Sequence, residues 1–265
     1  MNIYIKELKS HRKSLIFWSI GVILMVASGM SKYAGLKSSG QSITEVFSQM
    51  PKSMQAVMGI GPLDLSKASG FYGLLFLYLV LMATIHAAML GATIISKEER
   101  DKTSEFLFVK PVSRTKIISA KLLAAFTNIV IFNLVTFVSS LVAVGKMSEG
   151  EDVNGDIAIT MVGMFILQLV FLAIGSAISA VKKRPKTAGS LATGILLLVF
   201  LLSVAIDLNE KLENLKYLTP FKYFEAKNMM YGGGFEGVYL ILSALLIVLL
   251  IYVTYVFYKK RDLNV

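Results

Sequence analysis

The chain has 265 residues, of which 55% are hydrophobic and only 17% are charged, a composition outside the range of ordinary soluble domains. It contains no cysteine, so disulfides, thiolate metal sites and cysteine nucleophiles are excluded. The net charge of +10 does not indicate nucleic-acid binding. The cations stand in short blocks at the ends of apolar runs, where membrane topology and anionic lipid account for them.

The amino-terminal segment predicts an amphipathic helix that lies along the membrane surface. Met1, Tyr4, Ile5 and Leu8 recur at helical spacing and form an apolar stripe opposite three lysines. Together with the apolar run after it, the segment has the outline of a signal peptide. A signal peptide has no need of such a face, so we expect the segment to be retained.

Six apolar stretches are long enough to cross the hydrocarbon core of a bilayer as helices. They cover residues of about 15–32, 71–95, 117–145, 157–181, 188–206 and 237–258. We therefore predict an all-α integral membrane fold with a single transmembrane domain over residues 1–265. Lys121 falls in the first turns of the third span, where we expect its long side chain to reach the membrane interface.

Lysine and arginine are distributed unequally between the two sides of these spans. Eighteen of the 27 lie in the amino-terminal arm, residues 96–121, residues 182–186 and the carboxy-terminal tail, and nine lie in the alternate loops. Cytosolic flanks carry the excess of positive charge, so both termini are predicted to be cytosolic and the acidic loop 146–156 external.

Two of the predicted external loops contain signals for short helices. Ser42 to Glu45 forms a capping box that opens a helix ending near Pro51. In the last loop, Thr219 is the expected N-cap and Pro220 the first residue of a helix that three glycines close after residue 231.

Catalytic and metal-binding patterns were sought and not found. His86 is the one ionisable side chain deep in a span, and a packing role is favoured over a ligand contact. Asn128, Asn133 and Gln168 are interpreted first as interhelical hydrogen-bonding residues and second as residues of a transport pathway. The spans contain no paired catalytic groups, so we predict a chain without enzymatic activity, cofactor or metal. The energy for any transport would then come from outside this chain.

Residues 96–121 form a charged region between the second and third spans, with seven cations and four acids. Thr103, Phe106, Leu107 and Lys110 fall at helical spacing before Pro111, so a short cytosolic helix is expected to present an apolar stripe to a partner. The pattern alone fits equally well a solvated loop whose apolar residues rest on lipid headgroups.

The order of residues in this region resembles the signature of type-2 ABC transporter permeases, the membrane subunits of ATP-binding-cassette exporters. The resemblance also covers the amphipathic arm, the six spans and the segment Thr219 to Tyr223. One departure is Lys102, where the family commonly has glycine. The signature residues are Glu98, Glu99, Thr103, Glu105, Leu107, Pro111, Ser113, Arg114, Ile117 and Lys121.

The resemblance implies that Lys97 to Phe108 is a coupling helix that binds a separate ATPase subunit, which would hold the ATP and magnesium. It also implies two ATPase subunits and a second permease copy, as a homodimer or heterodimer, in a bacterial cell membrane, with short re-entrant helices before the last span. The expected coupling residues are Glu98, Glu99, Thr103, Glu105, Phe106, Leu107, Pro111 and Arg114.

The expected function is therefore export of an amphipathic compound, such as a peptide antibiotic, a drug or a lipid-like molecule. The alternative is a membrane-embedded binding or immunity protein without turnover. The proline start and glycine end of the helix 220–231 further suggest an outer gate over the path, the alternative being a helix that only covers the span ends. The expected gate residues are Pro220, Phe221, Phe224 and Gly233.

Overall fold

The computed structural model describes residues 2–39, 42–60, 63–101, 112–182 and 185–260, and within these ranges it contains helices and no strands. Six helices are long and apolar enough to cross a membrane, which confirms the predicted spans and the all-α fold. They are α1 (Ile3–Ser38), α4 (Ala68–Arg100), α6 (Arg114–Gly145), α7 (Asn154–Val181), α8 (Ala188–Leu208) and α10 (Gly237–Lys260).

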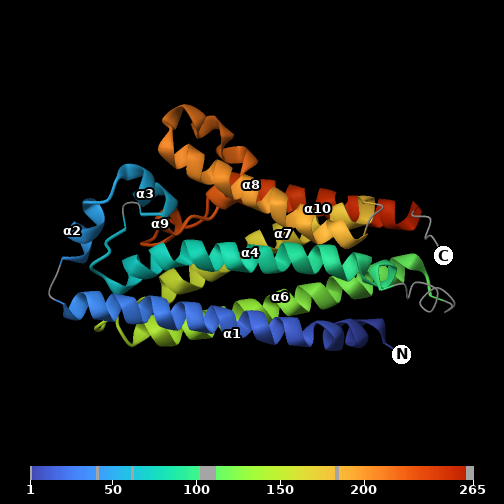
Figure 1. Cartoon of the computed structure of the whole chain (residues 1–265), viewed down its shortest axis with the longest axis horizontal. Coiled ribbons are helices and arrows are strands. Elements are labelled where there is room, and N and C mark those ends of the chain that lie inside the picture. The colour runs from blue at the N-terminus through green and yellow to red at the C-terminus, as the bar shows by residue number, and fades with distance from the viewer. Residues whose placement is uncertain (1, 40–41, 61–62, 102–111, 183–184, 261–265) are drawn as a thin grey trace.

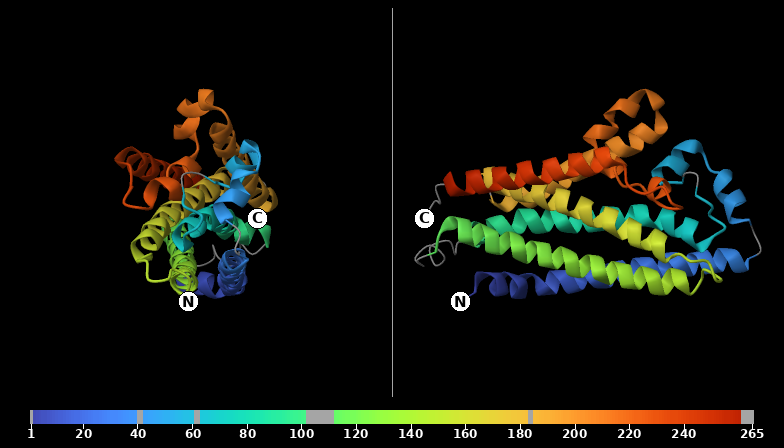
Figure 2. Two further views of the ribbon diagram at one scale, coloured as in Figure 1. Left: turned by 90° about the vertical axis from the view of Figure 1, so that its left-hand side faces the viewer. Right: turned by 180° about the vertical axis from the view of Figure 1, so that it is seen from behind.

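The long helices run side by side along the long axis of the molecule (Figure 1). Helices α4 and α7 pack against each other at the centre, with α1 and α6 on one side and α8 and α10 on the other, as the end-on view in Figure 2 also shows. Most of α4 and α7 is buried, whereas α1 and α10 are mostly exposed, as expected of helices that face lipid or another subunit. Both chain termini lie at one end, which we call the terminal end; the opposite end is the loop end.

Small residues bring α4 and α7 into close contact. A Cβ atom at Gly91 would lie 2.3 Å from the carbonyl oxygen of Leu172, and one at Gly175 would lie 2.2 Å from that of Ala88. Neither position has room for a methyl group, so the two backbones touch at this crossing. Association through small residues is the usual packing mode of helices in a bilayer, where hydrophobic burial gives little advantage.

The amino-terminal arm differs from its prediction, because it and the first span form one continuous helix. Helix α1 has 36 residues, contains no proline, and reaches its first glycine only at Gly21, so nothing in the sequence breaks the backbone hydrogen bonding at the membrane surface. Asn2 caps its start by accepting a hydrogen bond from the amide of Tyr4 at 3.1 Å.

Short helices cover the loop end. The predicted helix start is confirmed in α2 (Ile43–Ser48), where the hydroxyl of Ser42 accepts from the amide of Glu45 at 3.3 Å, one of the two hydrogen bonds of a capping box. A further helix, α3 (Lys52–Val57), follows Pro51. The connection between α7 and α8 at the terminal end contains the 3-10 turn η1 (Pro185–Thr187).

The predicted single helix over residues 220–231 is wrong. The segment consists of the 3-10 helix η3 (Pro220–Lys222) and the short helix α9 (Ala226–Met229), and the 3-10 helix η2 (Glu210–Leu218) precedes it. Glu225 adopts an extended backbone (φ −76°, ψ 134°) between η3 and α9, which interrupts the helix. Thr219 stands at the start of η3, but its hydroxyl donates to the carbonyl of Val199 on α8 at 3.0 Å and does not cap.

Candidate functional site

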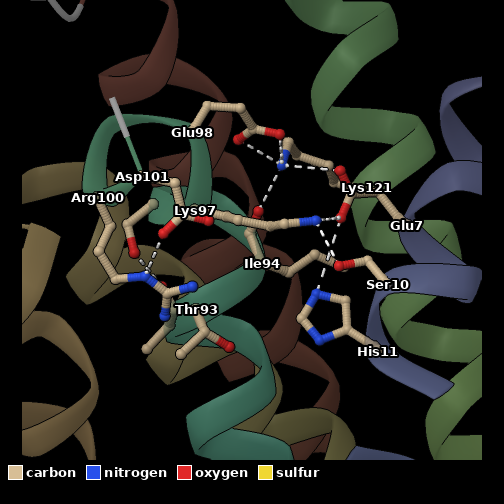
Figure 3. A network of polar contacts seen from close by, with 12 residues as sticks. Glu7, Ser10, His11, Thr93, Ile94, Lys97, Glu98, Arg100, Asp101 and Lys121 are labelled. Carbon is tan, nitrogen blue, oxygen red and sulfur yellow. Dashed lines mark hydrogen bonds and ion pairs between the residues drawn. The ribbon is translucent and has the colours of Figure 1, made fainter. Parts of the chain in front are cut away.

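A buried lysine joins three helices at the terminal end. Lys121 of α6 is fully buried, and its ammonium donates to both carboxylate oxygens of Glu98 on α4 at 2.8 Å and to the carbonyl of Ile94 at 2.6 Å (Figure 3). The same ammonium lies 3.4 Å from a carboxylate oxygen of Glu7 on α1. The expectation that Lys121 reaches the membrane interface is therefore wrong, because two carboxylates and a carbonyl hold its charge inside the bundle.

Glu7 extends the network to a second lysine. Its carboxylate is 1% exposed and lies 3.5 Å from the ammonium of Lys97, which also donates to the hydroxyl of Ser10 at 2.6 Å. His11, one turn after Glu7, has its Nε2 atom 3.7 Å from the same carboxylate. We call Glu7, Lys97, Glu98 and Lys121 the buried ion cluster; it contains two positive and two negative side chains.

The cluster has a mechanical consequence for its helices. Removing one partner from a buried ion pair leaves an uncompensated charge and costs about 3 to 5 kcal/mol, so the pairs resist separation one at a time. Helices α1, α4 and α6 are therefore held as one unit at this end, and displacing the end of α4 displaces all three.

The cluster lies beside the segment for which the sequence predicts a coupling helix. Of the predicted coupling residues, Glu98 is in the cluster, Glu99 is on the last turns of α4, and Arg114 begins α6. Arg114 donates to the carbonyl of Lys259 on α10 at 2.8 Å, which connects the last helix to the same end. The remaining predicted coupling residues lie outside the described residues; they are Thr103, Glu105, Phe106, Leu107 and Pro111.

Sequence reasoning missed Glu7 and His11 as members of this network. A signal was present, because Glu7 is the only acidic residue before Glu45 and lies between Tyr4 and Leu8 on the apolar face of the arm. A single acid on an apolar helical face predicts a buried cationic partner. The identity of that partner depends on how α1 packs against α4 and α6.

Three of the four predicted gate residues, Pro220, Phe221 and Phe224, are buried within the chain at the loop end, whereas Gly233 is exposed. The ring of Phe221 lies 5.1 Å from that of Phe171 on α7 and 5.3 Å from that of Phe200 on α8, between ring centroids. Pro220 and Phe224 are also buried, with the Phe224 ring 5.8 Å from that of Phe235. The aromatic side chains thus fill space between helices of one subunit.

Charged residues surround these aromatics. Lys222 is 7% exposed, and its ammonium lies 2.6 Å from carboxylate oxygens of both Asp207 and Glu225. Lys227 pairs with the same two acids at 3.2 and 3.3 Å. Burial alone would lower the pKa of Lys227, but the charges of Glu225 and Asp207 and hydrogen bonds to both hold that pKa above its ordinary value, so it stays charged. A continuous helix over residues 220–231 would place Lys222 and Glu225 toward water or lipid headgroups, whereas in the structure two acids enclose Lys222.

Gly233 lies in a tight turn. Its amide donates to the carbonyl of Met230 at 3.2 Å, and a Cβ atom would lie 1.9 Å from the carbonyl oxygen of Asn228. The neighbouring Gly232 and Gly234 have φ angles of +84° and +73°, a region that favours glycine. The glycines therefore form a defined turn before α10.

The polar residues inside the spans make packing contacts. Asn133 on α6 donates to the side chain of Gln168 and the carbonyl of Met161 on α7, both at 3.2 Å, which confirms an interhelical role. Asn128 donates to the carbonyl of Ala124 in its own helix at 2.8 Å. The ring of His86 on α4 lies 5.5 Å from that of Trp18 on α1 and 5.0 Å from that of Phe132 on α6.

A family model described as "ABC-2 family transporter protein" matches residues 1–263, nearly the whole chain. No curated protein matches it.

Proposed function

The chain belongs to the ABC-2 transporter family and is a multi-pass membrane permease, and we propose that it is the transmembrane subunit of an exporter that moves an amphipathic compound out of the cell. The energy would come from ATP and magnesium bound to separate ATPase subunits. Family membership supports such partners.

The observation that carries this proposal is the position of the buried ion cluster. The segment 102–111 connects the end of α4 to the start of α6, and the cluster joins these two helices to α1 through Lys121 (Figure 3). An ATPase that moves this segment would therefore move α1, α4 and α6 together. In this proposal the terminal end faces the cytosol, and the ATPase contacts the part of the predicted coupling segment that follows α4, because Lys97 and Glu98 are paired within the buried ion cluster.

The assembly we propose contains two ATPase subunits and two permease copies. Large apolar side chains are exposed along α10 and on one face of α8, among them Leu198, Leu201, Val248 and Tyr252. Such faces suit contact with lipid or with a second membrane subunit.

We further propose that the segment 220–234 acts as an outer gate. Its aromatic residues close the space between α7 and α8, and its lysines pair with Asp207 at the end of α8. A shift of α8 relative to α7 would therefore require this segment to move.

Co-purification with the ATPase and reconstitution in liposomes test the proposal. We expect the chain to retain an ATPase from its own cells, and the reconstituted complex to hydrolyse ATP and concentrate an amphipathic dye or peptide on the external side. A chain that purifies without an ATPase and protects cells by binding the compound stoichiometrically would instead be a binding or immunity protein.

A further inference from the structure

A cavity of about 280 Å³ lies at the loop end between α3, α4, α8, η3 and α9. Its volume is near the lower limit of known small-molecule pockets, about 300 Å³, which suits one alkyl chain or a compact ligand better than a lipid with two chains. The short helices α3 and α9 lie near the end of α4 at the loop end (Figure 1), and residues of all three line the cavity.

The lining is apolar on one side and charged on the other. Phe76, Leu77 and Val80 of α4 and Phe200 of α8 line it from within the spans. The charged lining residues come from elements at the loop end: Lys52 on α3, Asp207 at the end of α8, Glu225 before α9 and Lys227 on α9. This arrangement of apolar and charged lining residues matches an amphiphile whose alkyl chain points into the membrane and whose head group faces the outer surface.

Both signs of charge line the cavity, because two lysines accompany two carboxylates. A head with one net charge would meet an opposite and a like charge, whereas a zwitterionic head can place each of its charges opposite a complementary one. Lys222 is not among the lining residues, and its ammonium lies 2.6 Å from the carboxylates of both Asp207 and Glu225. The ammonium of Lys227 lies farther from the same carboxylates, at 3.2 and 3.3 Å. Lys227 is thus the cation more readily shared with a ligand anion. The Asp207 side chain is 25% exposed and lines the cavity, so its carboxylate can contact a ligand ammonium.

We propose that this cavity binds a zwitterionic amphiphile with a single alkyl chain, held by its ammonium at Asp207 and by its anion at Lys52 and Lys227. That this amphiphile is the exported compound rests on the proposed function. Binding of the amphiphile to the cavity does not, because binding requires no ATPase. A lysolipid that resides in the membrane has the same chemistry as an exported amphiphile, so the experiments must distinguish these two ligands.

The test uses the purified full chain in a non-ionic detergent and a lysophosphatidylcholine that carries a photoreactive diazirine in its acyl chain. We expect labelling of peptides that contain residues 52–60 or 71–80. Unlabelled lysophosphatidylcholine should compete at an about tenfold lower concentration than lysophosphatidylglycerol, which is anionic, or hexadecyltrimethylammonium, which is cationic. Labelling confined to other peptides, or equal competition by all three, overturns the proposal.

Two variants with matched controls test the assignment of the residues. Lys52 is exposed, and Lys52→Glu gives the cavity lining a net negative charge. This variant should therefore prefer the cationic competitor. Lys211→Glu, on η2 outside the cavity, is the control and should keep the original head-group preference. Val80→Phe fills the cavity and should abolish labelling, whereas Val238→Phe, on the exposed face of α10, should preserve it. An unchanged head-group preference in Lys52→Glu contradicts the proposal even if Val80→Phe fails to fold.

Reconstitution with the ATPase distinguishes the two sources. An exported amphiphile should stimulate ATP hydrolysis and leave the membrane on the external side. A resident lysolipid should bind with the same head-group preference and change neither quantity. Binding without stimulation therefore supports the site and counts against the amphiphile as the transported compound.

Discussion

The ammonium of Lys121 on α6 lies 2.8 Å from both carboxylate oxygens of Glu98 on α4, with the lysine fully buried. The two residues lie on either side of the segment 102–111 in the sequence, so their contact joins the two helices that this segment connects. Glu7 of α1 adds a third helix to them. The contact therefore connects the predicted cytosolic segment to three of the six long helices.

Breaking this contact should destabilise the bundle. Lys121→Met removes the cation and leaves Glu7 and Glu98 buried, so we expect a loss of about 3 to 5 kcal/mol in unfolding free energy, measured by denaturant titration in detergent. Lys116→Met on the exposed face of the same helix is the control, with an expected change within about 0.5 kcal/mol. Removing Glu98 as well, in Lys121→Met with Glu98→Met, should recover part of the loss. A double variant as unstable as the sum of the two single variants would show that the pair is not coupled.

The apolar stripe of the segment 102–111 is predicted to contact the ATPase. Phe106→Ala should weaken association by about 1 to 3 kcal/mol, because a buried aromatic anchor is lost while no span is changed. Affinity for the purified ATPase, measured by fluorescence anisotropy in nanodiscs, provides the value. Phe126→Ala, at a ring of α6 that is 41% exposed, is the matched control. Normal affinity and normal ATPase stimulation in the Phe106 variant would contradict the coupling role.

The orientation of the bundle can be tested directly, because the chain has no cysteine background. We expect a single cysteine at Asp152 to react with an impermeant maleimide from outside intact cells and one at Lys13 to react only after permeabilisation. Both positions are exposed, unlike Ser148 in the same predicted external loop, which is buried. The reverse pattern of labelling would invert the topology and place the segment 102–111 outside.

The close crossing of α4 and α7 predicts intolerance of a single methyl group. Gly175→Ala places a Cβ atom 2.2 Å from the carbonyl oxygen of Ala88, so the helices must separate, and we expect a loss of about 1 to 3 kcal/mol in unfolding free energy. Gly194→Ala on α8 has no atom within 4 Å of its new Cβ and should be neutral or stabilising by up to about 1 kcal/mol. Equal effects of both variants on the thermal unfolding midpoint would show that the crossing is looser than described.

The proposed outer gate depends on motion between the segment 220–234 and α10. Gly233→Pro is a poor test, because it removes the amide that bonds to Met230 and adds atoms beside the carbonyl of Asn228. Gly237 begins α10 in open space, where proline is tolerated as the first helical residue, so Gly237→Pro stiffens the connection without disrupting the turn. We expect assembled complexes of this variant to keep ATP hydrolysis and to export less in a liposome flux assay. Unchanged export would favour a covering role for the segment.

The sequence by itself determined the six spans, the all-α class and the N-cap at Ser42. These depend on runs of apolar residues and local hydrogen bonds, which are properties of contiguous residues. The family could also be recognised from the sequence, because its signature residues, from Glu98 to Lys121, lie in one contiguous stretch. The amphipathic arm was correctly identified as helical, but its continuity with the first span was not predicted.

Only the tertiary structure decided which charges are paired inside the bundle. Glu7 and Lys121 are 114 positions apart, and no local pattern distinguishes a lysine that reaches the membrane interface from one that pairs between helices. The same holds for Lys222, which the helical pattern placed toward water and which Asp207 and Glu225 enclose. A buried charge is stable only where partners from other elements converge on it, and that convergence depends on how the helices pack.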